Sequence, residues 1–319
     1  MIKKLFPALL LLAAMIWGFA FSAQKAAADI PPFTVGAARG IFAALFLLGL
    51  IPLFDRLNRT GRRLFSERGI DITKSEWTGG ILCGLILSAA TFAQQFGIGE
   101  GTDAGKASFI TALYVVLVPI YGLFLGKRAP VRVFVSVGIA TVGFYLLCIT
   151  GDFSLAFSDG VVLICAFIFA AHILVIDAFS RKTDGVRMSC VQFFVFFLAN
   201  LAGALIFESP LDFSGILSCF GAVLYLGIGS SGVAYTAQIL GQKGTDPAVS
   251  SILLSMESVF GVIGSAIFLG EQMSAREYIG CAVVFFAVLL AEVDFPALIR
   301  RRKNAPSAPA DSPSDSEEK

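Results

Sequence analysis

A chain of 319 residues with 56% hydrophobic and only 15% charged side chains carries more apolar surface than one water-soluble core can bury. Its formal net charge of +1 argues against nucleic acid as a partner. The composition therefore predicts an integral membrane protein that is surrounded by a lipid bilayer.

A membrane-spanning helix needs roughly 20 mostly apolar residues, and ten stretches of this chain meet that requirement. We predict the spans Leu5–Ala23, Phe33–Phe54, Trp77–Ile98, Lys106–Leu125, Val131–Ile149, Gly160–Phe179, Ser189–Phe207, Ile216–Leu240, Ala248–Leu269 and Tyr278–Phe295. The first stretch follows two lysines and also fits a secretory signal. We interpret it as an uncleaved helix, because its apolar run is long for a signal core.

Lysine and arginine predict which side of the membrane each loop faces. With a cytoplasmic N-terminus, 20 of the 24 Lys and Arg residues lie on the cytoplasmic side, three lie outside and Arg39 lies within a helix. The three outside are Lys25, Lys106 and Arg276. An asymmetry of this size predicts that both termini are cytoplasmic, in the plasma membrane or bacterial inner membrane.

Two distant stretches of the chain resemble each other. The first is GTDAGKASFITALYVVLVPIYGLFLGK, from Gly101 to Lys127, and the second is GTDPAVSSILLSMESVFGVIGSAIFLGE, from Gly244 to Glu271. Their matching residues lie 143 positions apart near the start and 144 apart near the end. The match predicts a duplicated chain.

A duplicated unit of five helices, an odd number, re-enters the membrane in the opposite orientation, and such inverted repeats are typical of secondary transporters. The predicted fold is therefore an all-α integral membrane protein of ten transmembrane helices in two inverted five-helix repeats. The first repeat spans residues 1–151 and the second spans residues 152–299. Residues 300–319 begin with a basic run and continue with a composition typical of disorder, so we expect a cytoplasmic tail.

Several sequence motifs identify the family that this chain resembles. They are Trp17-Gly18, Pro32 followed by Arg39, the run QQFGIGEGTDAGKASFITALYVVLVP, and the pattern from Met256-Glu257-Ser258 to Leu269-Gly270-Glu271. With them the chain resembles the drug/metabolite transporter superfamily, in particular the EamA-type permeases. The resemblance implies a ten-helix fold with a central cavity that moves small metabolites, often outward. Two positions depart from the family pattern: Lys127 stands where Glu is common, and Ser258 where Pro is frequent.

Ionisable groups at membrane depth cost several kcal/mol, on the order of 3 on insertion scales, and are functional candidates for that reason. Glu257 lies near the middle of its span and is a candidate for proton coupling or cation binding. The alternative is a protonated carboxyl bonded to Ser255, Ser258 or a neighbouring helix. Arg39 is a candidate for binding a substrate carboxylate, unless its side chain extends to the interface or pairs with a helix terminus.

The remaining candidates carry no fixed charge. His172, the only histidine, is a candidate for titration near neutral pH or for a hydrogen-bonded core position. Gln95 and Gln238 are related by the repeat and offer donors and acceptors for the two halves of one path, although hydrogen bonding between helices explains them nearly as well. Trp17, Tyr114 and Tyr235 are candidates for an aromatic cavity wall or for interfacial positions.

We therefore expect a secondary active transporter of small organic metabolites, with an amino-acid-like exported substrate and proton coupling as finer hypotheses. The six cysteines have no disulfide or metal-ligand spacing, and the chain has no GxxxxGK[ST] sequence, so we expect no metal, no cofactor and no ATP use. A membrane enzyme would need a catalytic motif such as HExxH or GxSxG, and neither occurs. A non-transporting receptor or structural protein would not need the repeat. The sequence does not indicate the oligomeric state.

Overall fold

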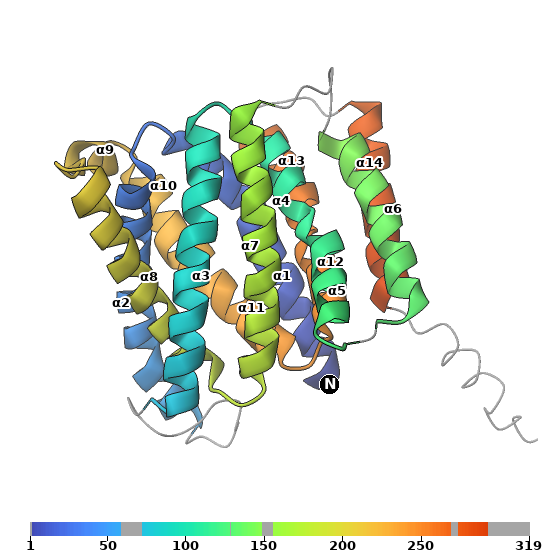
Figure 1. The fold of residues 1–319 in the computed structure, drawn as a ribbon, viewed down its shortest axis with the longest axis horizontal. Helices are drawn as coiled ribbons and strands as arrows, with labels where there is room; N and C mark the ends of the chain where they lie inside the picture. The colour runs from blue at the N-terminus through green and yellow to red at the C-terminus, as the bar shows by residue number, and fades with distance from the viewer. Residues whose placement is uncertain (1, 59–71, 128, 149–155, 269–273, 293–319) are drawn as a thin grey trace, which may run out of the picture.

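The computed structural model describes residues 2–58, 72–127, 129–148, 156–268 and 274–292, and the secondary structure of these residues is entirely helical. The helices stand side by side (Figure 1). Their bounds are α1 Ile2–Ala26, α2 Pro32–Asn58, α3 Lys74–Gly99, α4 Ala104–Ala112, α5 Tyr114–Phe124, α6 Val131–Cys148, α7 Phe157–Ser180, α8 Gly185–Phe207, α9 Phe213–Ser218, α10 Phe220–Leu224, the π-helix η1 Tyr225–Ala234, α11 Tyr235–Gln242, α12 Pro247–Leu254, α13 Glu257–Phe268 and α14 Ala275–Glu292.

Within the described residues, eight helical segments are long and apolar enough to cross a membrane. They are Leu5–Ala26, Pro32–Leu53, Lys74–Gly99, Ala104–Phe124, Phe157–Ser180, Gly185–Phe207, Phe220–Gln242 and Pro247–Gly264. Two further apolar helices, Val131–Leu146 and Tyr278–Ala291, are shorter and pack against each other at one edge of the bundle (Figure 1). The predicted boundary between residues 151 and 152 and the tail 300–319 lie outside the described residues.

The outer surface of the bundle is apolar. Large side chains such as Leu45 of α2, Ile164 of α7 and Leu205 of α8 are more than half exposed, whereas Arg39, Gln238 and Glu257 are almost completely buried. Water-soluble proteins rarely expose apolar patches of such extent. The arrangement fits a bundle that meets lipid on the outside and keeps its polar groups within.

Two spans that the hydropathy predicts as continuous helices, Lys106–Leu125 and Ala248–Leu269, are each broken near their middle. The first is divided into α4 and α5 at Leu113, and the second into α12 and α13 at Ser255-Met256. At each break an amide bonds three residues back instead of four: Leu113 N to Ile110 O at 3.2 Å, and Met256 N to Leu253 O at 3.3 Å. This tighter turn interrupts the α-helix.

The breaks fall at matching positions of the two similar stretches. Both α4 and α12 and likewise α5 and α13 begin 143 residues apart. In Figure 1, α4 and α13 lie in the upper half and α5 and α12 in the lower half, and each of these pairs is in contact. The two broken spans therefore run in opposite directions beside each other. Ser258 links them, because its Oγ donates to the Ser108 carbonyl at 3.1 Å.

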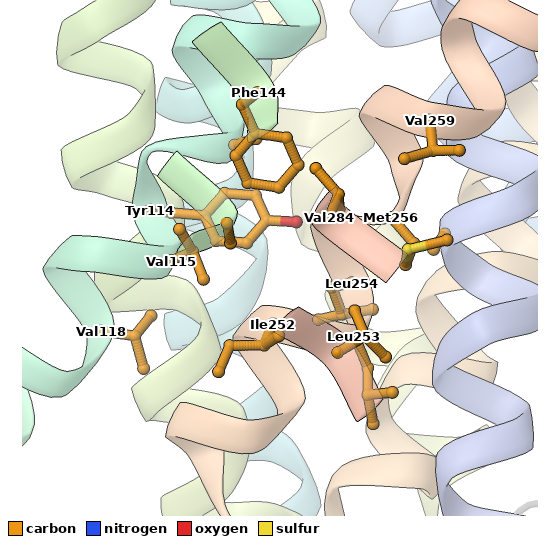
Figure 2. Close-up of a cluster of buried hydrophobic side chains, with 14 of the residues drawn as sticks. Tyr114, Val115, Val118, Phe144, Ile252, Leu253, Leu254, Met256, Val259 and Val284 are labelled. Carbon is orange, nitrogen blue, oxygen red and sulfur yellow. The ribbon is translucent and has the colours of Figure 1, made fainter. Parts of the chain in front are cut away.

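Apolar side chains fill the space around the breaks (Figure 2). Val115 and Val118 of α5 and Ile252 and Leu254 of α12 belong to one buried cluster. Tyr114 is a buried member of this cluster, and its hydroxyl points toward the side of the view where Met256 and Leu254 lie (Figure 2). The cluster holds the two broken spans together, so their interrupted backbone is enclosed within the protein. Irregular backbone at membrane depth requires such an enclosure.

The predicted span Ile216–Leu240 is not one regular helix. Residues 216–218 belong to the short helix α9, which Asp212 caps by accepting from Gly215 N at 2.8 Å. After Cys219 the chain continues as α10, the π-helix η1 and α11. Extended π-helix is rare and occurs frequently at functional sites. Gly227 and Gly232 of η1 bring this segment close to Phe42 and Phe46 of α2.

A buried ionic cluster joins helix ends at one end of the bundle. Arg187 of α8 donates from Nη2 to both carboxylate oxygens of Asp55 at 2.9 and 3.0 Å, and its Nη1 lies 3.1 Å from Asp184. The Asp184 amide in turn donates to Glu76 of α3 at 2.9 Å. Burial lowers the pKa of the neighbouring Lys243, which donates to the Thr183 carbonyl at 2.7 Å. The predicted spans place Arg187 in a cytoplasmic loop, but it lies within α8 and is buried, because α8 begins at Gly185.

Candidate functional site

A polar cavity lies inside the bundle, where α1, α2, α3, α7, η1 and α11 meet the two broken spans. Its polar and aromatic lining consists of Trp17, Gln24, Arg39, Gln94, Thr111, Tyr114, His172, Ser230, Tyr235, Gln238 and Glu257. The cavity volume is about 30 Å³, which is room for water but not for an organic solute. Side chains or helices must therefore move before an organic solute fits in this cavity.

Seven of the eight predicted site residues line this cavity, namely Trp17, Arg39, Tyr114, His172, Tyr235, Gln238 and Glu257. Gln95 does not. Its amide nitrogen instead faces α1 and donates to the carbonyls of Gln24 and Ala27 at 3.2 and 3.4 Å. The cavity is lined by its neighbour Gln94, which donates to Thr111 at 3.0 Å. Adjacent residues of a helix point in directions about 100° apart. The match between the two repeats does not determine which of these two neighbouring glutamines of α3 faces the cavity.

Glu257 is the first residue of α13 and is only 4% exposed. No Lys, Arg or His among the described residues lies within ion-pair distance of its carboxyl, and Oε1 has no hydrogen-bond partner there. Ser255 and Ser258, the alternative partners in the sequence, donate instead to the carbonyls of Ile252 and Ser108. Two features favour a negative charge here: the start of α13, because a helix N-terminus attracts negative charge, and the nearby Tyr114 hydroxyl.

Arg39 projects from α2 into the bundle and is 4% exposed. Its Nε donates to Ser231 Oγ at 3.0 Å and its Nη2 donates to Ser230 Oγ at 3.3 Å. The guanidinium carbon also lies 6.0 Å from the centre of the Phe196 ring, within the range of a cation–π interaction. No carboxylate among the described residues pairs with it. The side chain therefore neither extends to the interface nor pairs with an acidic residue of the described chain.

His172 of α7 is completely buried, and neither of its ring nitrogens has a hydrogen-bond partner among the described residues. Its ring lies edge-on to Tyr235, with 5.8 Å between the centroids. Both amide atoms of Gln192 also lack partners. His172 lines the cavity and Gln192 lies close enough to interact with its ring. Buried polar groups of this kind require a partner such as water or a ligand.

Trp17 and Tyr235 form an aromatic pair in the cavity wall, with ring centroids 4.6 Å apart. The indole Nε1 of Trp17 donates to the Ser230 carbonyl at 3.1 Å, which ties α1 to the π-helix. Tyr114 completes the set of aromatic residues that the sequence predicts for this wall. Its hydroxyl has no hydrogen-bond partner within the described chain and can bond a water or a solute.

Gly18 lets α1 approach the second break closely. A Cβ atom at this position would lie 2.7 Å from the Glu257 carbonyl, 2.7 Å from the Gly261 amide nitrogen and 2.5 Å from Phe260 Cβ. Contacts this short with backbone atoms are prohibitive. The Trp17-Gly18 pair thus has two roles: Trp17 lines the cavity, and Gly18 permits the helix contact that places it there.

An apolar helical bundle around a polar cavity defines the class as multi-pass membrane proteins. This chain belongs to the EamA-like transporter family, which matches residues 6–149 and 156–292. It is 29% identical over 296 residues to an uncharacterized transporter of Archaeoglobus fulgidus, over 92% of this chain and 87% of that protein.

A protein of known crystal structure has a similar fold. The TM-score is 0.72 at 19% sequence identity, and the match covers 94% of this chain and 99% of the other. At this level of identity the likeness shows the fold alone. Family membership confirms the resemblance found in the sequence and makes the chain a membrane transporter homologue.

Proposed function

We propose that this protein is a secondary active transporter of small organic metabolites, amino-acid-like compounds among them, and that it works by alternating access. The observation that carries the proposal is the cavity at the meeting of the two broken spans. Its lining contains a guanidinium and a carboxyl that form no ion pair with a described residue, and the amide oxygens of Gln24 and Gln238, which have no hydrogen-bond partner in the described chain. Such groups are costly to bury unless a ligand or water bonds to them.

We further propose ten spans, with α6 and α14 completing the eight longer segments. The matched bounds of the two broken spans and their antiparallel contact support an inverted repeat, with units at residues 1–151 and 152–299. The Lys and Arg asymmetry supports cytoplasmic termini, with residues 300–319 as a cytoplasmic tail in the plasma membrane. Broken helices at the interface between inverted repeats are a recurrent way to build a substrate site at membrane depth.

In this mechanism the five-helix units move against each other, so that the cavity opens to one side of the membrane at a time. The cavity volume of about 30 Å³ is too small for an organic solute, so helices must separate before a solute enters. The breaks at Leu113 and Ser255-Met256 supply points at which half of each span can tilt without the other half. The chain's own residues bind and orient the solute, and closure excludes water from it.

Glu257 is the group that we propose for proton coupling. A buried carboxylate with no cationic partner is unfavourable, whereas its protonated form can donate a hydrogen bond. When the cavity opens to one side, water and solvent protons reach this carboxyl, and when it opens to the other side the proton leaves. Binding and release of one proton per cycle would couple transport to the transmembrane proton gradient.

The experiment that tests the proposal is solute counterflow in proteoliposomes that contain the purified full chain. Vesicles preloaded with an unlabelled amino acid, sugar or nucleobase are diluted into the same labelled solute at trace concentration. A transporter gives transient accumulation of label for at least one compound, and protein-free vesicles give none. A receptor or structural protein would give no counterflow with any compound, and an enzyme would convert the label chemically.

A further inference from the structure

The side chain of Arg39 is fixed in position by neutral partners. The guanidinium is always charged, it is almost fully buried, and within the described chain its hydrogen-bond partners are the hydroxyls of Ser230 and Ser231. Two hydroxyls orient the planar group but bring no negative charge. The charge at this position therefore lacks a counterion among the described residues.

From this geometry we infer that Arg39, Ser230 and Ser231 form a binding site for one carboxylate group of the transported solute; the inference rests on the proposed function. Nη1 makes no bond to a described residue and remains available to an anion. Each serine hydroxyl accepts from Arg39, so its own proton is free to donate. Because Ser230 and Arg39 both line the cavity, a carboxylate there receives bonds from the guanidinium and from at least one hydroxyl.

The charge balance and the shape of the site favour a carboxylate over other anions. One guanidinium neutralises one negative charge, whereas a phosphate ester would bring nearly two. A planar guanidinium matches the two oxygens of a carboxylate side by side. A spherical chloride ion uses only part of that geometry.

The π-helix η1 places the hydroxyls of Ser230 and Ser231 within hydrogen-bond distance of the Arg39 guanidinium. Ser230 and Ser231 lie in η1, and the Ser230 carbonyl accepts from the Trp17 indole at 3.1 Å. Trp17 is thereby joined through Ser230 to Arg39: the indole bonds the carbonyl and the guanidinium bonds the hydroxyl of the same residue. Ser230 and Ser231 are positioning residues for Arg39, and Trp17 is an intrinsic reporter of the site.

The chain contains two tryptophans, Trp17 and Trp77. In a Trp77→Phe background, the fluorescence of Trp17 in purified full-length protein is titrated with sodium propionate at constant ionic strength. We expect a saturable change with propionate and none with propylammonium chloride or sodium chloride. A response to chloride equal to that of propionate, or a saturable response to propylammonium alone, would overturn the assignment.

Substitutions of Arg39, Ser230 and Ser231 then test the role of each residue in propionate binding. Arg39→Gln should abolish the propionate response, and Arg39→Lys, which keeps the charge but loses the planar fork, should weaken the affinity roughly tenfold. Ser230→Ala and Ser231→Ala should each weaken it by about tenfold, the usual effect of one hydrogen bond to a charged group. Lys25→Gln removes an exposed charge from the end of α1 and should leave the response unchanged.

The outcomes separate this inference from the proposed function. If Arg39→Gln does not yield a monodisperse protein, the test rests on the propionate affinity of Ser230→Ala and Ser231→Ala. Unchanged propionate affinity in both of these variants contradicts the site. Propionate binding without counterflow of any solute would refute transport and leave the site intact. Counterflow of a carboxylate solute that is equally fast in Arg39→Gln would refute the site and leave transport intact.

Discussion

Tyr114 and Glu257 are the first residues of α5 and α13, so each directly follows the break in one of the two antiparallel spans. They lie 143 residues apart, the same interval that relates the two similar stretches, and both line the central cavity. The Tyr114 hydroxyl and the Glu257 carboxyl lie close enough to interact with each other, and among the described residues neither the hydroxyl nor Glu257 Oε1 makes a hydrogen bond of standard geometry. At matching positions one half of the chain thus supplies a phenol and the other a carboxyl, so the two halves are chemically unequal at the site.

The first prediction concerns Glu257. Glu257→Gln keeps the size of the side chain and much of its hydrogen bonding but cannot exchange a proton. We expect this variant to fold and insert, to retain solute counterflow and to lose accumulation driven by a pH gradient. The measurement is uptake of labelled solute into proteoliposomes with and without an imposed pH difference.

A matched substitution separates coupling from structure. Glu257→Leu removes all hydrogen bonding, so it should lower the yield of folded protein if the carboxyl has a structural role. Uphill, pH-driven uptake by Glu257→Gln at the parental rate would refute proton coupling through this residue, even if the protein transports its solute.

The second prediction concerns the contact of α1 with the second break. Gly18→Ala would place Cβ 2.7 Å from two backbone atoms, and overpacking of this kind costs about 1–3 kcal/mol. We expect a lower melting temperature of the detergent-purified protein. Gly49→Ala in α2 is the control, because a Cβ atom added there would have no neighbour within 4 Å. It should leave the melting temperature unchanged or raise it, since Ala favours helix more than Gly does.

The third prediction concerns the buried ionic cluster. Arg187→Gln removes the partner of Asp55 and Asp184 inside the protein, and breaking a buried pair typically costs about 3–5 kcal/mol. We expect a large fall in thermal stability. Arg181→Gln is the matched control, because Arg181 is 62% exposed and lies 3.9 Å from Asp177; its loss should cost at most about 1 kcal/mol. Equal effects of the two variants would show that the cluster does not stabilise the fold.

The fourth prediction concerns orientation. The positive charge of the loops predicts that both termini lie in the cytoplasm. A reporter that is active only in the cytoplasm, fused after Lys319, should be active in cells, and a reporter that requires export should be silent. The opposite pattern would contradict the cytoplasmic C-terminus, whether the number of spans is odd or the whole bundle has the opposite orientation.

Much of the cavity lining was predictable from the sequence. An isolated charge in an apolar stretch is costly, and that cost singled out Arg39 and Glu257 as candidate site residues; both are buried and line the cavity. The Trp17-Gly18 pair and the duplicated stretches pointed to the same region. Asp246 accepts from the Ala248 amide at 2.9 Å, with Pro247 at the start of α12, as expected for an Asp-Pro helix start.

The breaks in the two spans were not predictable from hydropathy, because an apolar run looks the same whether its backbone is continuous or interrupted. The π-helix η1 was missed for the same reason. Gln94, in place of Gln95, lines the cavity because helix packing, and not sequence, sets the face of α3.

The two departures from the family pattern have partners that only the fold reveals. Lys127 pairs with Asp177 of α7, and Ser258 bonds the backbone of α4 at Ser108. Both contacts tie the broken spans to their neighbours. These residues therefore act within the packing of the bundle and do not line the cavity.

The central claim is that one cavity opens alternately to the two sides of the membrane. Gln238 lines that cavity and is buried in this structure, so a Gln238→Cys variant in a cysteine-free background reports its accessibility. The measurement is the labelling rate with a membrane-impermeant thiol reagent in right-side-out and in inside-out vesicles. Alternating access predicts labelling from both sides, with a saturating transported solute changing the two rates in opposite directions. Labelling from one side only, or from neither side in any condition, would contradict it.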